Sequence, residues 1–300
     1  MMSWRDRILA ACFAAEFAFV CGCLGVAAQE RAIPAAGAPA VTAVPCGGDE
    51  ITRANVSRVL DGRNFVLDDG REVHLAAVEV PLLPVPGDLH AAAGGTAAKA
   101  ALAALVAGAQ VVLRRAQYKS DRYGRIVAYA DASRKDSARS VQAELVSAGF
   151  ARVGDDVGNE ICAAELLRRE NAARQAKLGL WANPYYDPVR ADKPADILAQ
   201  RGHFALVEGN VVSVHESGAT VYVNFGRRWS RDFAVTIRKR NERSFAAAGL
   251  DLKGLAGQRV RVRGWIEARG GNAGSAGDGY WHAPWIEVTH PEQIERADRD

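Results

Sequence analysis

The sequence predicts a mainly β chain with helices (α+β), organised as a tandem of two five-stranded barrels of the OB type. Short runs in which apolar and polar residues alternate recur in both halves of the chain and predict strands. In each half a helical stretch stands among the predicted strands, an order compatible with a small closed barrel. With 300 residues, of which 49% are hydrophobic, the chain has enough apolar material for two cores.

Residues 1–28 predict a signal peptide. Arg5 and Arg7 precede a mostly apolar run, and the small residues at 26–28 suit cleavage by a signal peptidase. The run is too short and broken for a membrane span, so we expect no stable span in the mature chain. The mature protein is then exported, either periplasmic or secreted, and the alternative is a lipid anchor at Cys23. Residues 29–50 are rich in Ala and Pro and predict a flexible tether.

Cleavage of the signal peptide would leave two cysteines in the mature chain, Cys46 and Cys162. They are either two unrelated thiols or one structural disulfide. Because an even number of cysteines in an oxidising compartment favours pairing, we predict a disulfide between them. Two sulfurs without nearby histidines make a poor zinc site.

The first predicted domain covers residues 51–184. Three strands surround the hairpin turn at 68–70, and two more surround a turn at 119–124. Glycines and caps predict three helices. Their ranges are about 97–106, 140–148 and 160–178, the last one ending at Gly179.

Residues 51–181 resemble the thermonuclease (staphylococcal-nuclease-like) family. The similarity rests on the D-R-Y-G-R turn at 121–125, the helix containing E-L-V-S-A-G-F-A-R-V at 144–153, and L-G-L-W at 178–181. The resemblance implies an OB-fold barrel that cleaves DNA and RNA with calcium. It also assigns a role to particular positions of this sequence.

Several of these positions carry residues that cannot perform the family's chemistry. Where the family has D-G-D-T the chain has an arginine at the second aspartate, and its next strand ends in Pro-Leu instead of Pro-Glu. The resemblance places Arg63, Glu79 and Val80 at metal positions, His74 and Arg125 at phosphate-contacting positions, and Leu82 at the general base. A hard cation needs several oxygen ligands, and leucine accepts no proton. We therefore expect no catalytic residue, no metal site and no cofactor.

Two alternatives remain open for this site. Acidic residues nearby in sequence could replace the lost ligands and retain calcium-dependent cleavage; they are Asp68, Asp69, Glu72 and Asp88. Arg125 either contacts phosphate or pairs with Asp121 across its turn, and His74 replaces a phosphate-binding arginine only if it is protonated.

The second half consists of a predicted linker at 185–202, a second barrel at 203–295 and a tail at 296–300. It resembles an uncharacterised extension found in some exported thermonuclease-like proteins, and this likeness carries no chemistry. The net charge of +3 does not by itself indicate nucleic-acid binding, but cations concentrate at 227–243. The candidate binding residues are Arg227, Arg228, Trp229 and Arg231.

Basic side chains beside aromatic rings on such a sheet are typical of single-strand nucleic-acid binding. The alternative is a solvated arginine turn, with Tyr222, Phe225 and Phe233 in the core. Trp265, Trp281 and Trp285 are predicted to be packing residues.

The sequence therefore predicts an exported, catalytically degenerate thermonuclease-like protein. Its predicted partner is single-stranded nucleic acid or another polyanion. The alternatives are an active calcium-dependent phosphodiester hydrolase and an envelope protein-interaction module. The sequence contains neither a nucleotide-phosphate loop nor a zinc-protease motif, and it does not predict an oligomeric state.

Overall fold

The structure is a computed structural model that describes residues 46–81, 89–134, 137–271 and 281–297. These residues belong to one compact unit, Val44–Asp300. The predicted signal peptide with Cys23, the first part of the predicted tether, Leu82 and Asp88 lie outside the described residues. No helix in the described ranges is long and apolar enough to cross a membrane.

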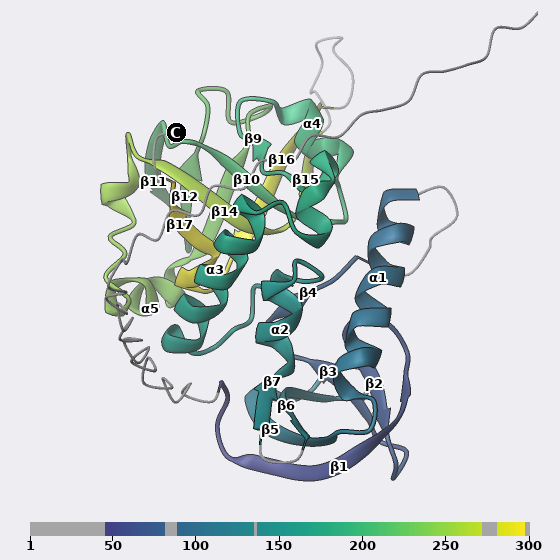
Figure 1. The fold of residues 1–300 in the computed structure, drawn as a ribbon. Helices are drawn as coiled ribbons and strands as arrows, with labels where there is room; N and C mark the ends of the chain where they lie inside the picture. Colours follow the sequence, from purple (N-terminus) through teal and green to yellow (C-terminus); the bar gives the residue numbers. More distant parts are fainter. Residues whose placement is uncertain (1–45, 82–88, 135–136, 272–280, 298–300) are drawn as a thin grey trace, which may run out of the picture. The chain divides into compact units, whose positions relative to one another are not determined.

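The first group of strands forms a six-stranded sheet that is partly closed. Its strands are β1 (Glu50–Val59), β2 (Asn64–Leu67), β3 (Glu72–Leu75), β5 (Gln110–Ser120), β6 (Ile126–Arg134) and β7 (Ser137–Ser140). The order is β3-β2-β1-β5-β6-β7, and β3 also pairs in parallel with β6. Pairing therefore runs in a ring through β1, β2, β3, β6 and β5 (Figure 1). Side chains of these strands such as Phe65 and Leu113 are fully buried in the core. The short strands β4 (Val78–Glu79) and β8 (Arg152–Val153) pair with each other.

Three helices accompany this sheet, as the sequence predicts, with different ends. They are α1 (Leu89–Val106), α2 (Val141–Ser147) and α3 (Glu160–Gln175). Helix α1 begins earlier than the predicted residue 97. Helix α3 ends before the predicted residue 178, because Lys177 adopts a left-handed conformation with φ of 52° and breaks the helical hydrogen bonds.

Two glycines, Gly149 after α2 and Gly179 after α3, lie against each other and bring the ends of the two helices together. Gly149 has a φ of 73°, and a Cβ atom there would lie 2.2 Å from the carbonyl oxygen of Leu178. Leu180 donates its backbone N–H to the carbonyl of Gly149 at 2.8 Å, and the neighbouring Trp181 is fully buried. The two sequence motifs that contain these residues, at 144–153 and 178–181, therefore serve the packing of the scaffold.

The predicted disulfide between Cys46 and Cys162 is confirmed. The Cα atoms of the two residues are 5.3 Å apart, within the range that a disulfide spans. Since Cys162 lies in α3, the bond ties the chain just before β1 to that helix.

The second group of strands divides between two sheets. The elements are β9 (Val189–Arg190), α4 (Pro194–Ala199), β10 (Phe204–Asn210), β11 (Ser213–Ser217), β12 (Thr220–Asn224), β13 (Ala234–Arg238), α5 (Glu242–Ala247), β14 (Arg259–Trp265), β15 (Glu267–Gly271), β16 (Trp281–Val288) and β17 (Ile294–Arg296). One sheet has the order β17-β14-β10-β9 and the other β11-β12-β13-β16-β15. A second closed five-stranded barrel is not confirmed, because the segments expected as single strands continue as β10–β11 and β14–β15 and enter both sheets.

A buried ion pair joins the two groups of strands through α3. Arg263 of β14 is fully buried, and its guanidinium donates to both carboxylate oxygens of Glu170 at 2.9 and 3.0 Å and to the carbonyl of Val153 at 3.0 Å. It also pairs with Glu295. The alternation along β14 by itself would place Arg263 on a solvated face, but Glu170 of α3 covers it.

Candidate functional site

Two of the three residues that the resemblance places at metal positions form an ion pair with each other. Arg63 lies in the turn between β1 and β2, and one of its Nη atoms contacts a carboxylate oxygen of Glu79 on β4. The same nitrogen lies 3.4 Å from the carbonyl oxygen of Val78. Glu79 is only 8% exposed, so its carboxylate is buried and does not lie at the solvent-exposed edge of the site. Val80 is 5% exposed and belongs to the hydrophobic core.

The turn that carries Arg63 is fixed by Asp61. One carboxylate oxygen of Asp61 accepts the backbone N–H groups of Arg63 and Asn64, each at 2.8 Å. The other accepts the side-chain amide of Asn64 at 2.7 Å. An aspartate that accepts from the residues following it is a common turn-forming device, and here it uses both oxygens within the turn.

The residues at the phosphate-contacting positions meet at Asn64. The Oδ1 atom of Asn64 lies 2.7 Å from Nδ1 of His74 and 3.0 Å from an Nη atom of Arg125. His74 is the cross-strand partner of Asn64, which explains the first contact. Burial lowers the pKa of His74 to about 4, and the positive charges of Arg63 and Arg125 add to this. The ring is therefore neutral near pH 7 and does not supply the cation that a phosphate contact at this position needs.

Arg125 pairs with Asp121 across its turn, one of the two alternatives that the sequence left open. Its Nε atom donates to a carboxylate oxygen at 2.6 Å, and its backbone N–H donates to the other at 3.1 Å. Burial acts to raise the pKa of Asp121, but the hydrogen bonds from Arg125 and Tyr123 outweigh it and the pKa lies below its ordinary value. Arg125 therefore reaches the site with its charge balanced.

The surroundings of Glu79 act on the pKa of its carboxyl group in opposite directions. Burial raises the pKa of Glu79 to about 7, while Arg63 and, more weakly, Arg152 act to lower it. Arg152 is itself buried and lies over the rings of Tyr186 and Phe204 at 5.5 and 5.2 Å. The pKa of the nearby Asp155 is also raised, mainly by burial and further by the negative charge of Asp156.

These residues do not fit a calcium ion. Calcium in proteins takes six to eight oxygen ligands, and a guanidinium adjacent to the only remaining ligand repels it. Arg63 contacts Glu79 where the ion would need that carboxylate. Within the described ranges, no three His, Cys, Asp or Glu side chains gather closely enough to hold a metal ion.

The acidic residues considered as replacements, as far as the structure describes them, lie elsewhere. Asp69 pairs with Arg71 in the hairpin turn, and Asp68 accepts from Asn55 at 3.3 Å. Glu72 is exposed at the start of β3. The acids that do approach the site are two that the sequence reasoning missed, Asp155 and Asp156. Asp156 accepts the N–H of Ala77, 79 residues away in the sequence, at 3.2 Å, and no local sequence pattern signals such a contact.

The predicted binding residues of the second half form an exposed loop between β12 and β13. We call residues 225–233 the arginine loop; Arg227, Arg228, Trp229 and Arg231 are exposed on it. Asp232 fixes its shape by accepting the backbone N–H of Arg228 at 2.8 Å and pairing with that side chain at 3.6 Å. In the described part of the chain, no ion pair involves Arg227 or Arg231.

The aromatic residues around the arginine loop have different places. Phe225 and Phe233 are buried and lie at 5.0 Å from each other, as the packing alternative predicts. Tyr222 does not join them, because it faces the opposite side of β12 from Val221 and Val223. Trp229 is 65% exposed.

One comparison with known proteins finds a family model that is similar to part of this chain. Residues 72–183 match the sequence model of the family described as Staphylococcal nuclease homologue. The match begins after Arg63 and includes His74, Glu79 and Arg125. A search of curated proteins found no match.

Proposed function

Because the chain carries a staphylococcal nuclease homologue domain, we propose that it is an exported nuclease homologue that has lost hydrolysis and binds single-stranded nucleic acid or another polyanion. The observation that carries the loss of hydrolysis is the ion pair of Arg63 with Glu79. It turns two metal positions into a closed, nearly charge-neutral contact. Without a metal the site lacks charge stabilisation of several kcal/mol at the reacting phosphate.

The nuclease-like site is also a weak anion site. His74 is neutral near pH 7, and Asp121 and Glu79 neutralise the arginines beside it. A phosphate entering there would have to displace a carboxylate from its arginine.

The arginine loop is better suited to a polyanion. Its three arginines are exposed, and Asp232 is the acidic residue within residues 225–233. Hydrogen bonds within the loop fix its backbone before any ligand arrives, which lowers the ordering cost of binding. Arg240 and Arg243, which are exposed and follow the other end of β13, add further positive charge to this half of the chain.

Export is supported by the disulfide and by the predicted signal peptide. Disulfides persist in oxidising compartments and are rare in the cytosol. In an exported protein the bond between Cys46 and Cys162 would remain closed.

A direct test combines binding and cleavage assays on the chain lacking residues 1–28. We expect it to bind single-stranded DNA or RNA and to cleave neither, with calcium or with a chelator. Four phosphate contacts would weaken binding about fiftyfold between about 50 and about 200 mM salt. Residues 201–300 should not be tested alone, because Arg263 would lose its buried partner Glu170.

Two sets of variants sharpen this test. The triple change Arg227→Ala, Arg228→Ala and Arg231→Ala should flatten the salt dependence. A matched control removes three exposed arginines that pair with acids, Arg53, Arg71 and Arg168, and should leave it nearly unchanged. Cleavage by the wild-type chain that a chelator abolishes, or equal effects of both triple variants, would contradict the proposal.

A gain-of-function variant tests the site itself. Arg63→Asp, His74→Arg and Leu82→Glu together rebuild a metal ligand, a phosphate contact and a base. We expect this variant, and not the wild type, to gain thermal stability from calcium, because a ligand that binds only the folded state stabilises it. Some calcium-dependent cleavage should accompany the stabilisation.

A further inference from the structure

A pocket lies on the outer face of the β11-β12-β13-β16-β15 sheet. Its volume is about 460 Å³, within the range typical of sites for small organic ligands. Alternation along the strands creates it: Val221, Val235 and Ile286 point into the core, whereas Tyr222 and Trp285 point outward. None of the family's active-site positions lines this pocket.

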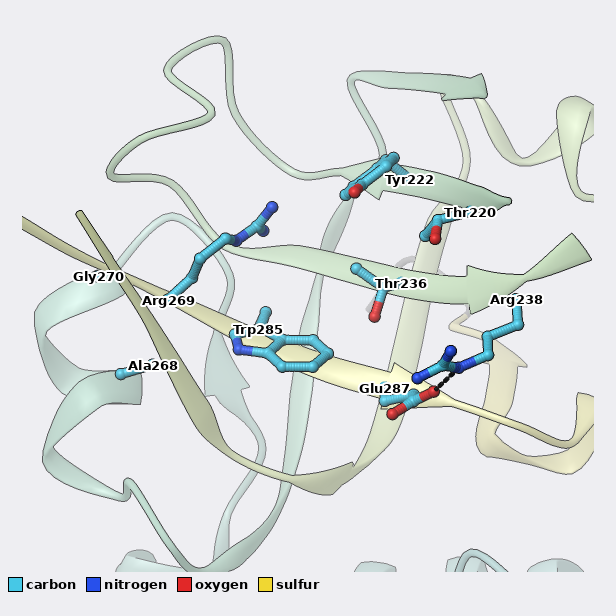
Figure 2. A pocket seen from close by; sticks show the side chains of 9 residues that line it. All are labelled: Thr220, Tyr222, Thr236, Arg238, Ala268, Arg269, Gly270, Trp285 and Glu287. Atoms are coloured by element: carbon cyan, nitrogen blue, oxygen red, sulfur yellow. Dashed lines mark hydrogen bonds and ion pairs between the residues drawn. The ribbon is translucent and has the colours of Figure 1, made fainter. Parts of the chain in front are cut away.

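Trp285 forms the floor of the pocket. Figure 2 shows its indole ring lying across β16, between Arg269 on one side and the pair of Arg238 with Glu287 on the other. The ring is partly exposed, although the sequence predicted it to be a packing residue. A partly exposed indole flanked by polar groups offers an apolar face to a flat ligand.

The wall opposite Trp285 is a preformed stack. The guanidinium of Arg269 lies 5.7 Å from the ring centroid of Tyr222, and the ring of Tyr222 stacks on His215 at 5.2 Å with 12° between the planes. The side-chain amide of Asn224 lies 3.0 Å from Nδ1 of His215 and forms a hydrogen bond with it. This bond fixes the orientation of the His215 ring, on which Tyr222 stacks.

The pocket also contains one polar atom without a partner, together with two hydroxyl groups. The Nε atom of Arg269 is buried and makes no hydrogen bond within the described residues. Such an atom carries the cost of a lost hydrogen bond until an acceptor reaches it. The hydroxyl groups of Thr220 and Thr236 line the pocket beside Tyr222 and supply further donors and acceptors.

This combination suits a planar ring that carries its own polar edge. A small anion is disfavoured, because Glu287 neutralises Arg238 at 2.8 Å and adds a carboxylate to the pocket. A lipid chain offers no acceptor and would leave the buried Nε atom of Arg269 without a partner. A nucleobase has two π faces for stacking and edge atoms that accept and donate.

The position of the pocket favours a base that belongs to a strand over a neutral sugar. Trp285 is the register partner of Ala234, the first residue of β13 and the next residue after the arginine loop. The exposed charges of Arg227 and Arg231 therefore lie near the end of the sheet where Trp285 stands. A single strand could place phosphates on the arginine loop and a base in the pocket at the same time.

We propose that this pocket binds an unpaired base of single-stranded nucleic acid, with Trp285 as its stacking surface and Arg269 as a hydrogen-bond donor to its edge. This inference rests on the proposed function and adds to it a defined site for bases. The arginine loop then supplies affinity for the backbone, and the pocket makes the protein distinguish strands with bases from other polyanions.

The test compares three probes on the chain lacking residues 1–28. They are an oligothymidylate of about 12 nucleotides, an abasic oligomer of the same length and inorganic polyphosphate. Trp285→Ala should weaken binding of the oligothymidylate about 5- to 150-fold, the range for loss of one base–aromatic stack, and leave the other two unchanged. Trp285→Phe should restore much of the loss.

Trp265→Ala is the matched control. Trp265 lies on β14 in the other sheet and is 37% exposed. The centroid of its ring is 6.1 Å from that of Phe204. Its removal should not alter the ratio of affinities for the oligothymidylate and the abasic oligomer. Arg269→Lys keeps the charge but loses the Nε donor and should lower that ratio more than Trp265→Ala does.

The outcomes separate the two proposals. If the wild type binds the oligothymidylate but Trp285→Ala does not change the ratio, the pocket proposal fails while the proposed function stands. Equal weakening of the oligothymidylate and abasic oligomer would show a structural role for Trp285 and would also overturn it. If the wild type binds none of the three probes, both proposals fail. Binding of a neutral oligosaccharide that depends on Trp285, with no effect on the oligothymidylate, would assign the pocket to another ligand.

Discussion

The arginines of the nuclease-like site and those of the arginine loop have opposite surroundings. At the site, Arg63 and Arg125 have side chains 15% and 23% exposed, and each one contacts a carboxylate. On the loop, Arg227 and Arg231 are exposed and have no ion pair within the described residues. The comparison shows that an arginine at a position where the family resemblance expects a phosphate contact, such as Arg125, is not for that reason a free cation. The capacity to attract an anion depends on the partners that the fold supplies.

The largest expected effect concerns the bond that ties the nuclease-like region together. The double change Cys46→Ser and Cys162→Ser opens a loop of 116 residues in sequence separation, and in the chain-entropy model it lowers the free energy of unfolding by about 4 to 5 kcal/mol. Urea denaturation followed by tryptophan fluorescence measures this. Polyanion binding by the variant under native conditions should keep its salt dependence, because the arginine loop is held by Asp232 and not by the disulfide. An unchanged unfolding midpoint would contradict this prediction.

The second largest effect concerns the ion pair of Arg263, a fully buried arginine, with Glu170. Glu170→Ala leaves Arg263 without its bidentate partner and should cost about 3 to 5 kcal/mol, the usual result of breaking a buried pair from one side. Glu165→Ala, on the same helix, removes an exposed carboxylate that pairs with Arg168 and should cost less than about 1 kcal/mol. Denaturant titration of the two variants compares them. Similar costs would mean that burial does not distinguish these pairs.

The scaffold of the nuclease-like region was accessible from the sequence because its signals are local. The paired glycines at 149 and 179 and the buried Trp181 stand in motifs that the packing requires. The even number of cysteines in a chain expected to be exported predicted the disulfide. The positions to which the family resemblance assigns chemistry, Arg63 among them, carry no such local packing signal.

The environment of the site was not accessible from the sequence. Glu79 looked like a ligand or a rim carboxylate, and only the structure brings it against Arg63 and behind it Arg152. Arg263 alternates with Val260 and Val262 along β14, a pattern typical of a solvated side chain, but α3, distant in sequence, covers it. Trp285 likewise became a pocket residue because β15 contributes Arg269 to the same face. Each of these outcomes depends on a contact between distant segments.

A third prediction uses the pH dependence of the paired site. The folded-state pKa of Glu79, about 7, lies above its ordinary value of 4.5, so the folded protein binds more protons than the unfolded chain between these values. This group's contribution to stability is therefore present below about pH 4.5 and decreases as the pH rises to 7. The free energy of unfolding of the wild type minus that of Glu79→Gln should fall by at most about 3 kcal/mol across the window. Denaturation at several pH values measures it, and a difference that rises with pH would reverse the sign and refute this account.

The smallest effect addresses the comparison of arginines most directly. Arg231→Ala removes an exposed cation from the arginine loop, and Arg125→Ala removes one that already pairs with Asp121. Each phosphate neutralised on a single strand contributes a slope of about −0.7 to the dependence of log K on log salt. Arg231→Ala should therefore make the slope shallower by about 0.7, a difference of about 2.6-fold in the salt response between about 50 and about 200 mM. Arg125→Ala should change it much less, because the carboxylate of Asp121 already balances that charge. If the two slopes change equally in titrations with the oligothymidylate, the ion pair at the nuclease-like site opens to phosphate, and the distinction between paired and exposed arginines does not govern binding.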